Sequence, residues 1–457
     1  MISLNASLEI AKRALQTHQL AMSVIGTNIA NVNSPGYSRR RAVVAAAAAM
    51  DSGYGYVGAG VEVRNIERAR DAVLDKFYRS HMSDLGKWAG IQNYLSNVET
   101  ITNEPGAGLS DVMGEFWSAW QDLANDPEQS ATRSAVLLRG QELCSTFHRL
   151  SANFRDLKQS LNEEIGAQIS RINELSGRLA DLNGVIIDAE VGGHEASGLR
   201  DERDLLTDEL SEIISVDVTE SSDGSTIIRL NSQVLVQGNT HRELELSVRG
   251  TTDSTSVVWK STGREVLIEG GLMEGYITAR DEYVNGYLAD LDALAGALVS
   301  RINSAHSAGY GLDGSTGNNF FDPERVTAAD IAIDPALASN LDLIAASAEG
   351  EVGDGRNALA IANLATANTM VGGSISFDDF YGSLVGRIGQ ESRVATSFLE
   401  AEELLVLGAE TQRLGVSGVS LDEEMAYMLS YQHAYQAMAR VVATIDEMMA
   451  TLIHSLG

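Results

Sequence analysis

The fold of this chain is decided where its first helix ends, in the sequence Asn28-Ile29-Ala30-Asn31-Val32-Asn33-Ser34-Pro35-Gly36-Tyr37. Ser34 precedes a proline, which disfavours a helical backbone at that position. Pro35 and Gly36 suit the two central positions of a type II turn, because proline restricts φ to about −65° and glycine accepts a positive φ. We therefore predict one helix over residues 1–33 that ends in a tight turn, followed by Tyr37 as a large amphipathic side chain.

Upstream of this turn, mostly apolar residues recur at alternating steps of three and four. This spacing is the a/d pattern of a coiled coil, so the first helix is expected to pack along one narrow seam. The seam positions are Leu8, Ala11, Leu15, His18, Met22, Ile25 and Ile29.

The C-terminal end of the chain carries a second seam with the same alternation. Its positions are Met428, Tyr431, Tyr435, Met438, Val442, Ile445, Met449, Leu452 and Leu456. Two seams separated by almost four hundred residues indicate a chain that leaves a terminal bundle, builds other domains and returns. That layout is typical of a subunit of an assembly.

The two ends also carry opposite charges. Residues 1–65 contain six basic and three acidic side chains, a net +3, whereas residues 420–457 contain one basic and five acidic side chains, a net −4. Burial of a single seam offsets only part of the entropy lost in ordering its helix. We therefore hypothesise that both termini are disordered in the free monomer and fold on assembly. The alternative is an intramolecular coiled coil that is stable by itself.

Between the termini, periodicity and turn residues predict a mainly α protein with a smaller β-rich insertion. Long helices are expected at 66–103, 110–125, 128–190, 198–214, 272–307 and 377–414, with a hinge at Gly415–Gly418 and a last helix at 421–456. Residues 37–65 are expected to be extended, and an Asp-Gly signal predicts a hairpin across 216–230. A second strand pair is expected across 244–259, and short mixed elements at 324–376.

Three domains follow from this pattern. Residues 1–65 and 415–457 are expected to form a terminal coiled-coil or axial core domain. Residues 66–214, 272–307 and 377–414 are expected to form a helical bundle. Residues 215–271 and 308–376 are expected to form an outer mixed, β-rich domain.

Composition excludes several classes of function. A net charge of −30 disfavours nucleic-acid binding, since phosphate backbones are repelled. No run approaches the roughly 18 apolar residues that span a bilayer, and Met1–Ser7 does not resemble a cleavable secretory signal. Cys144 is the single cysteine, which excludes an internal disulfide framework.

No catalytic, cofactor or metal site is expected from the motifs. Residues 53–58 match GxGxxG, but the alternating Val61-Glu62-Val63 follows where a dinucleotide site needs a helix. The eight histidines never lie at metal-ligand spacing, so a metal centre would require distant segments. The Asp313–Asn319 run lacks the order and closing Glu of a calcium loop and predicts a turn.

Several segments together resemble a known family. The 28–37 turn is similar to the N-terminal signature of bacterial flagellar rod, hook and hook-associated proteins. The C-terminal and middle segments resemble the flagellar hook-associated protein 1 (FlgK) family. These segments are Ser417-Gly418-Val419-Ser420-Leu421-Asp422-Glu423-Glu424-Met425, Leu429–Ala437, Gly271–Tyr276, Arg280–Tyr283 and Gly309–Gly314.

The resemblance implies a non-enzymatic axial subunit at the junction between hook and filament, with terminal helices packed as a tubular core. The implied partners are further copies of the chain, the hook protein on one side, a second junction protein on the other, and an export chaperone on the C-terminal helix. No nucleic acid, membrane or cofactor is implied. Export through the flagellar type III apparatus, with an uncleaved signal, would place the protein outside the cell.

The residues expected to carry subunit packing combine the turn with both seams. They are Leu8, Leu15, Met22, Ile25, Asn28, Ile29, Asn31, Asn33, Pro35, Gly36, Tyr37, Met428, Tyr431, Tyr435, Met438, Val442, Ile445, Met449, Leu452 and Leu456. The alternative function is a secreted coiled-coil effector or adhesin that uses the same export route. Deleting residues 425–457 would abolish motility under the first reading and leave it intact under the second.

Overall fold

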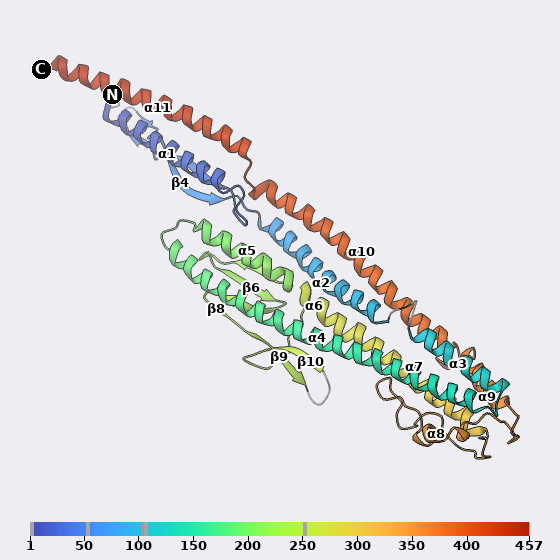
Figure 1. Cartoon of the computed structure of the whole chain (residues 1–457). Coiled ribbons are helices and arrows are strands. Elements are labelled where there is room, and N and C mark those ends of the chain that lie inside the picture. The colour runs from blue at the N-terminus through green and yellow to red at the C-terminus, as the bar shows by residue number, and fades with distance from the viewer. Residues whose placement is uncertain (1–3, 52–54, 103, 105–107, 250–253, 457) are drawn as a thin grey trace. The chain divides into compact units, whose positions relative to one another are not determined.

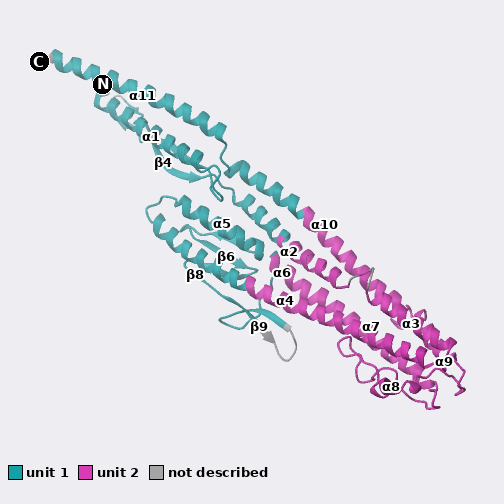
Figure 2. Cartoon of the chain, in the orientation of Figure 1, with its two compact units in different colours: residues 1–85, 169–271, 402–457 teal, residues 86–168, 272–401 magenta. Residues whose placement is uncertain are grey.

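A computed structural model describes residues 4–51, 55–102, 104, 108–249 and 254–456 (Figure 1). The chain divides into two compact units (Figure 2). Unit 1 comprises Met1–Leu85, Ile169–Gly271 and Glu402–Gly457, and unit 2 comprises Gly86–Gln168 and Leu272–Ala401. This division does not distinguish a terminal core from a helical bundle, so the three-domain division expected from the sequence stays a prediction.

The mainly α architecture is confirmed. Within the described residues the long helices are α1 (Leu4–Ala30), α2 (Ala72–Thr102), α3 (Leu109–Asn125), α4 (Ser130–Glu190), α5 (Ser197–Ile213), α7 (Asn285–Ala308), α10 (Phe377–Ser417) and α11 (Leu421–Leu456). Most of their ends lie within three residues of the expected ones. Helix α2 begins six residues late, because strand β4 (Val61–Arg68) extends further than the sequence indicated.

Residues 37–65, expected to be extended, contribute to an antiparallel ribbon. Strand β1 (Arg40–Ala46) pairs with β4, and the register shifts by one residue between Val43 and Val44. The short strands β2 (Met50–Asp51) and β3 (Tyr56–Val57) pair with each other between them. The ribbon packs on α1, where the Thr17 hydroxyl donates a hydrogen bond of 3.2 Å to the Val61 carbonyl. Two of the GxGxxG residues, Gly53 and Tyr54, lie outside the described residues, and strands rather than a helix follow the motif.

The β-rich insertion of unit 1 contains both expected hairpins. A four-stranded sheet has the order β5 (Asp217–Glu220), β6 (Thr226–Leu230), β7 (Gln233–Gln237) and β8 (Thr240–His241), and β9 (Leu244–Arg249) pairs with β10 (Ser254–Trp259). Asn183 of α4 holds the sheet, since its side chain donates to the carbonyls of Thr226 (3.0 Å) and Gly238 (3.2 Å). Because Asn183 is fully buried, these bonds fix where the sheet lies on α4.

The helix expected at 272–307 is interrupted by a wider turn. Between α6 (Gly271–Thr278) and α7 the backbone forms a π-helix, η1 (Ala279–Val284). Here the buried Arg280 bonds the neighbouring Asp281 carboxylate at 2.7 and 2.8 Å and the Asn162 side chain at 3.0 Å. A π-turn accommodates one extra residue, which three-four periodicity cannot reveal.

Unit 2 has an aromatic core between α3, α7 and the loop at 318–322. Trp120 and Phe320 lie edge to face at 5.2 Å, and both are fully buried. The mixed region at 324–376 contains the short elements α8 (Pro335–Ser339), η2 (Leu341–Leu343), α9 (Arg356–Ala362) and η3 (Asn363–Ala365). The buried Arg133 guanidinium holds this region to α4, because it donates to the carbonyls of Leu341 (3.2 Å) and Ile344 (2.8 Å).

The predicted hinge at Gly415–Gly418 is wrong in its position. Helix α10 continues through Ser417, and the break covers Gly418–Ser420. One glycine inside a helix costs only about 1 kcal/mol, so Gly415 does not end it. The amide of Gly418 donates to the Leu414 carbonyl (2.8 Å), and the Ser420 carbonyl accepts from Glu424 as α11 begins. Among the described helices, none is long and apolar enough to cross a bilayer.

Candidate functional site

The two chain ends pack on each other, as the paired seams predicted. Helix α1 lies along α11 in unit 1 (Figure 1), and the His18 and Tyr431 rings are 5.8 Å apart. On α11 the least exposed side chains follow the predicted seam from Met428 to Met449, with Ile445 only 3% exposed. Leu452 is exposed, and the side chain of Leu456 lies outside the described residues.

The buried face of α1 is wider than the predicted seam. Of the predicted positions Ala11, Ile25 and Asn28 are buried, whereas Leu8, Leu15, His18, Met22 and Ile29 are half-buried. The buried set also includes Ala14, Thr17, Ala21 and Val24, which were not predicted. This follows because α1 is covered from two sides, by α11 and by the β1–β4 ribbon, where Ile10 lies against Gly60.

The turn after α1 has the predicted type II form. The Tyr37 amide donates to the Ser34 carbonyl (3.2 Å), and Gly36 has φ +74°. A Cβ at Gly36 would lie 3.5 Å from the Leu205 side chain, so glycine is required by its φ rather than by space. Asn31 supports the turn, because its amide bonds the Thr27 carbonyl and its oxygen accepts from Ser34.

Asn28 joins the turn, the first strand and the C-terminal helix in one buried cluster. Its oxygen accepts from the Tyr37 hydroxyl (2.8 Å) and the Arg40 amide (3.0 Å). Its amide donates to the Arg40 carbonyl (2.8 Å) and to the Glu424 carboxylate (2.9 Å). All of the hydrogen-bonding positions on this side chain are therefore used to connect segments 396 residues apart.

Arg39 and Glu424 form the ion pair of this cluster. The sequence indicated only that the two chain ends carry opposite net charges, not which residues pair. The Arg39 Nε donates to Glu424 at 2.7 Å, and its Nη1 donates to Glu423 at 2.8 Å. Burial alone would lower the pKa of Arg39, but the bond to Glu423 and the charge of Glu424 outweigh it and raise that pKa. Glu424 is 2% exposed, so the hydrogen bonds that it accepts from Asn28 and Arg39 are essential to its burial. We call Asn28, Tyr37, Arg39 and Glu424 the joint cluster.

A second network of ion pairs supports the joint cluster within unit 1. Arg68 bonds Asp201 (3.0 Å) and Asp204 (2.8 Å) of α5, and Asp201 also accepts from the Ser38 amide at 3.4 Å. Burial would raise the pKa of Asp204, but the charges of Arg70, Arg68 and Arg79 outweigh it and lower that pKa. Strand β4 and the segment that joins the turn to β1 are thereby fixed to α5.

A cavity of about 580 Å³ lies beside the turn. Its lining includes residues 32–37 on one side and 414–420 of the α10–α11 connection on the other. Asn33 and Pro35 are exposed at this cavity, and the Asn33 side chain makes no hydrogen bond to another described residue. The turn thus presents an open surface rather than a filled one.

The outer surface of α11 carries large exposed apolar side chains on both flanks of its seam. Leu421, Met425 and Leu429 recur at steps of four and are 47–51% exposed. Val441, Met448 and Leu452 follow at steps of seven and four and are 44–47% exposed. We call these six residues the α11 flanks. Apolar surface of this kind on a helix indicates further packing partners.

Comparison with known proteins agrees with this arrangement. Across 503 aligned residues the chain is 31% identical to flagellar hook-associated protein 1 of Bacillus subtilis, which covers 100% of this chain and 99% of that protein. The chain belongs to the flagellar hook-associated protein 1 family. The relative from Escherichia coli is 26% identical over 97% of this chain and 98% of its own length.

Family models match three parts of the chain. Residues 95–321 match the flagellar hook-associated protein FlgK helical domain. Residues 8–37 match the flagella basal body rod protein family, and residues 410–454 match the flagellar basal body rod FlgEFG protein C-terminal family. The first of these two terminal matches covers most of α1 and its turn, and the second covers the end of α10, the break and most of α11.

A solved structure shares the fold. It is the flagellar hook junction protein FlgK from Burkholderia pseudomallei, with a TM-score of 0.68, 15% identity, and coverage of 75% of this chain and 100% of that one. The resemblance found from the terminal sequences is confirmed, and the role of the chain is structural, at the hook–filament junction of the flagellum. Family membership favours a non-enzymatic protein, and the effector alternative is not favoured.

Proposed function

We propose that α1 and α11 of many copies pack side by side into the tubular core of the junction, and that the joint cluster anchors the start of α11 in each subunit. The observation that carries this proposal is the distribution of side chains on α11. One face is buried against α1, while the α11 flanks leave apolar side chains exposed on either side. A helix with three apolar stripes is suited to more than one neighbouring helix.

The same surfaces support finer proposals about partners. Further copies of the chain are expected along the α11 flanks, with the hook protein at one end of the ring and a second junction protein at the other. Before assembly, an export chaperone would cover the exposed apolar side chains of α11. Export by the flagellar type III route without cleavage would then deliver the chain outside the cell.

Replacing Leu429 by Glu tests the packing proposal. Leu429 is 51% exposed, so the monomer should tolerate the change, whereas a charge buried between subunits should block assembly. We expect loss of swimming and of filament retention on the hook, with the circular dichroism of the monomer unchanged.

Ser430→Glu is the matched control, because it adds the same charge at the neighbouring exposed position, which lies roughly 100° around the helix from Leu429. Normal swimming of the Leu429→Glu strain would refute the packing proposal. Equal loss in both strains would show that added charge alone impairs the helix.

A further inference from the structure

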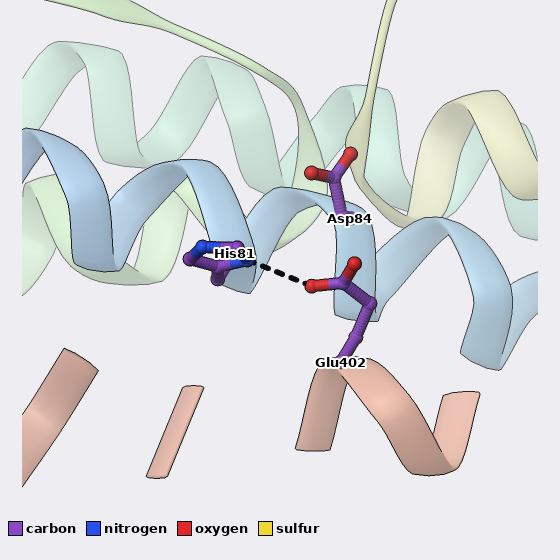
Figure 3. A group of neighbouring side chains, drawn as sticks. All are labelled: His81, Asp84 and Glu402. Carbon is purple, nitrogen blue, oxygen red and sulfur yellow. Dashed lines mark hydrogen bonds and ion pairs between the residues drawn. The ribbon is translucent and has the colours of Figure 1, made fainter. Parts of the chain in front are cut away.

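Three potential metal ligands meet in unit 1, outside the joint cluster. His81 and Asp84 lie on α2, and Glu402 lies on the facing part of α10 (Figure 3). One donor atom from each lies within 4.8 Å of the other two, and the His81 Nδ1 is 2.8 Å from the Glu402 carboxylate. Within the described residues, no other group of three His, Cys, Asp or Glu side chains comes this close.

The local structure holds these side chains near one another. His81 and Asp84 are three residues apart on one helix, a spacing that places both on the same face. The Phe77 ring, one turn earlier, packs edge to face on the imidazole with 4.5 Å between centroids and restricts its rotation. The side chains of His81 and Glu402 are only 16% and 15% exposed, whereas Asp84 is the most exposed of the three and leaves the group open to solvent.

The ligand set has a definite chemical preference. One imidazole nitrogen and two carboxylate oxygens suit Zn²⁺ and related first-row divalent ions, while Mg²⁺ and Ca²⁺ prefer oxygen ligands alone. Ligands bound at about 2.0–2.1 Å in a tetrahedron lie roughly 3.3 Å apart. The separations of 2.8 Å and up to 4.8 Å bracket that value, so small side-chain rotations would complete the geometry.

We propose that His81, Asp84 and Glu402 bind one divalent transition-metal ion, best matched by Zn²⁺, which ties α2 to α10 within unit 1. This goes beyond the junction role and does not depend on it. Two carboxylates neutralise the charge of the ion, the imidazole supplies selectivity, and water completes the coordination. The group could not be predicted from local sequence patterns, because His81 and Glu402 are 321 residues apart.

Metal titration of the full-length, metal-free chain tests the proposal. Calorimetry with Zn²⁺ measures affinity and stoichiometry, and the visible absorption of Co²⁺ reports its coordination. We expect one ion per chain, a Co²⁺ band that Zn²⁺ displaces, and at least tenfold weaker binding in His81→Asn, Asp84→Asn and Glu402→Gln. Because Asp84 is the most exposed of the three, its variant should fold even if the others do not.

His194→Asn is the control, since it removes an exposed histidine that is not part of this group and should leave both titrations unchanged. Equal affinity in the wild type and in Asp84→Asn would overturn the proposal, because it would mean general attraction of cations to a chain of net charge −30. Absence of Zn²⁺ binding by the wild type would overturn it as well, and His81 and Glu402 would then be an ion pair only.

Discussion

Protonation of His306 should weaken unit 2, because this ring is buried as a neutral group. Its Nδ1 donates to the Asn318 carbonyl (2.8 Å), and its Nε2 accepts from the Ala345 amide (2.9 Å). A second proton would remove the acceptor and leave the Ala345 amide without a partner. Burial accordingly lowers the pKa of His306 from 6.5 to about 4.

The direction and size of the effect follow from this difference in pKa. Below pH 6.5 the unfolded chain binds a proton at this histidine that the folded chain does not bind until about pH 4. The free energy of unfolding should therefore fall as the pH decreases from 6.5 to 4 and level off below it. The contribution of His306 to this fall is roughly 3 kcal/mol.

Urea unfolding followed by tryptophan fluorescence measures this, because Trp120 lies 6.0 Å from the His306 ring. His306→Gln keeps a donor and an acceptor but does not titrate, so its unfolding free energy should fall by roughly 3 kcal/mol less than that of the wild type between pH 7 and pH 4. His433→Gln, at an exposed position of α11, should follow the wild type. Parallel pH dependences of the wild type and His306→Gln would refute the reasoning.

Three further outcomes are expected. Glu424→Ala should destabilise the packing of α11 in each subunit by about 3–5 kcal/mol and abolish junction assembly, since it leaves Arg39 buried without that carboxylate. Sedimentation of the polymer measures assembly, and unimpaired assembly would contradict the prediction. Gly271→Ala should lower the melting temperature of unit 1, because its Cβ would lie 2.3 Å from the Ile213 carbonyl at φ +70°; an unchanged melting curve would count against this. Cys144 should resist thiol reagents until the protein unfolds, because burial raises its pKa to about 12; rapid labelling of the native chain would show otherwise.

Local patterns in the sequence predicted the helices and the turn well. Three-four spacing located α1 and α11, and Pro35-Gly36 predicted the turn type, since these features depend on residues close in the chain. The end of α10 was misplaced because Gly415 carries a turn signal that the surrounding helix overrides. Packing of α1 on two surfaces also broadened its buried face beyond the a/d positions.

Long-range polar contacts could not be predicted in the same way. Glu424 reads as one of three acidic residues in the first turn of a helix, a common pattern that favours exposure. Its burial depends on Arg39 and Asn28, which are 385 and 396 residues away. Complementary net charge indicated that the ends attract each other, but no pattern identified which of the acidic side chains would be buried.

The break at Gly418–Ser420 lies at one end of α11, so the helix can rotate about this point as a rigid rod. Its 36 residues extend about 54 Å, so a rotation of 10° at the break would move the far end by roughly 9 Å. The joint cluster contacts α11 only through Glu424 in its first turn, close to the axis of rotation, and therefore resists such a rotation weakly. Ile445 lies about 31 Å further along α11 than Glu424. Because it is buried at a greater distance from the break, its packing resists the same rotation far more effectively. The joint cluster therefore anchors the start of α11, whereas contacts distant from the break determine the angle of the helix.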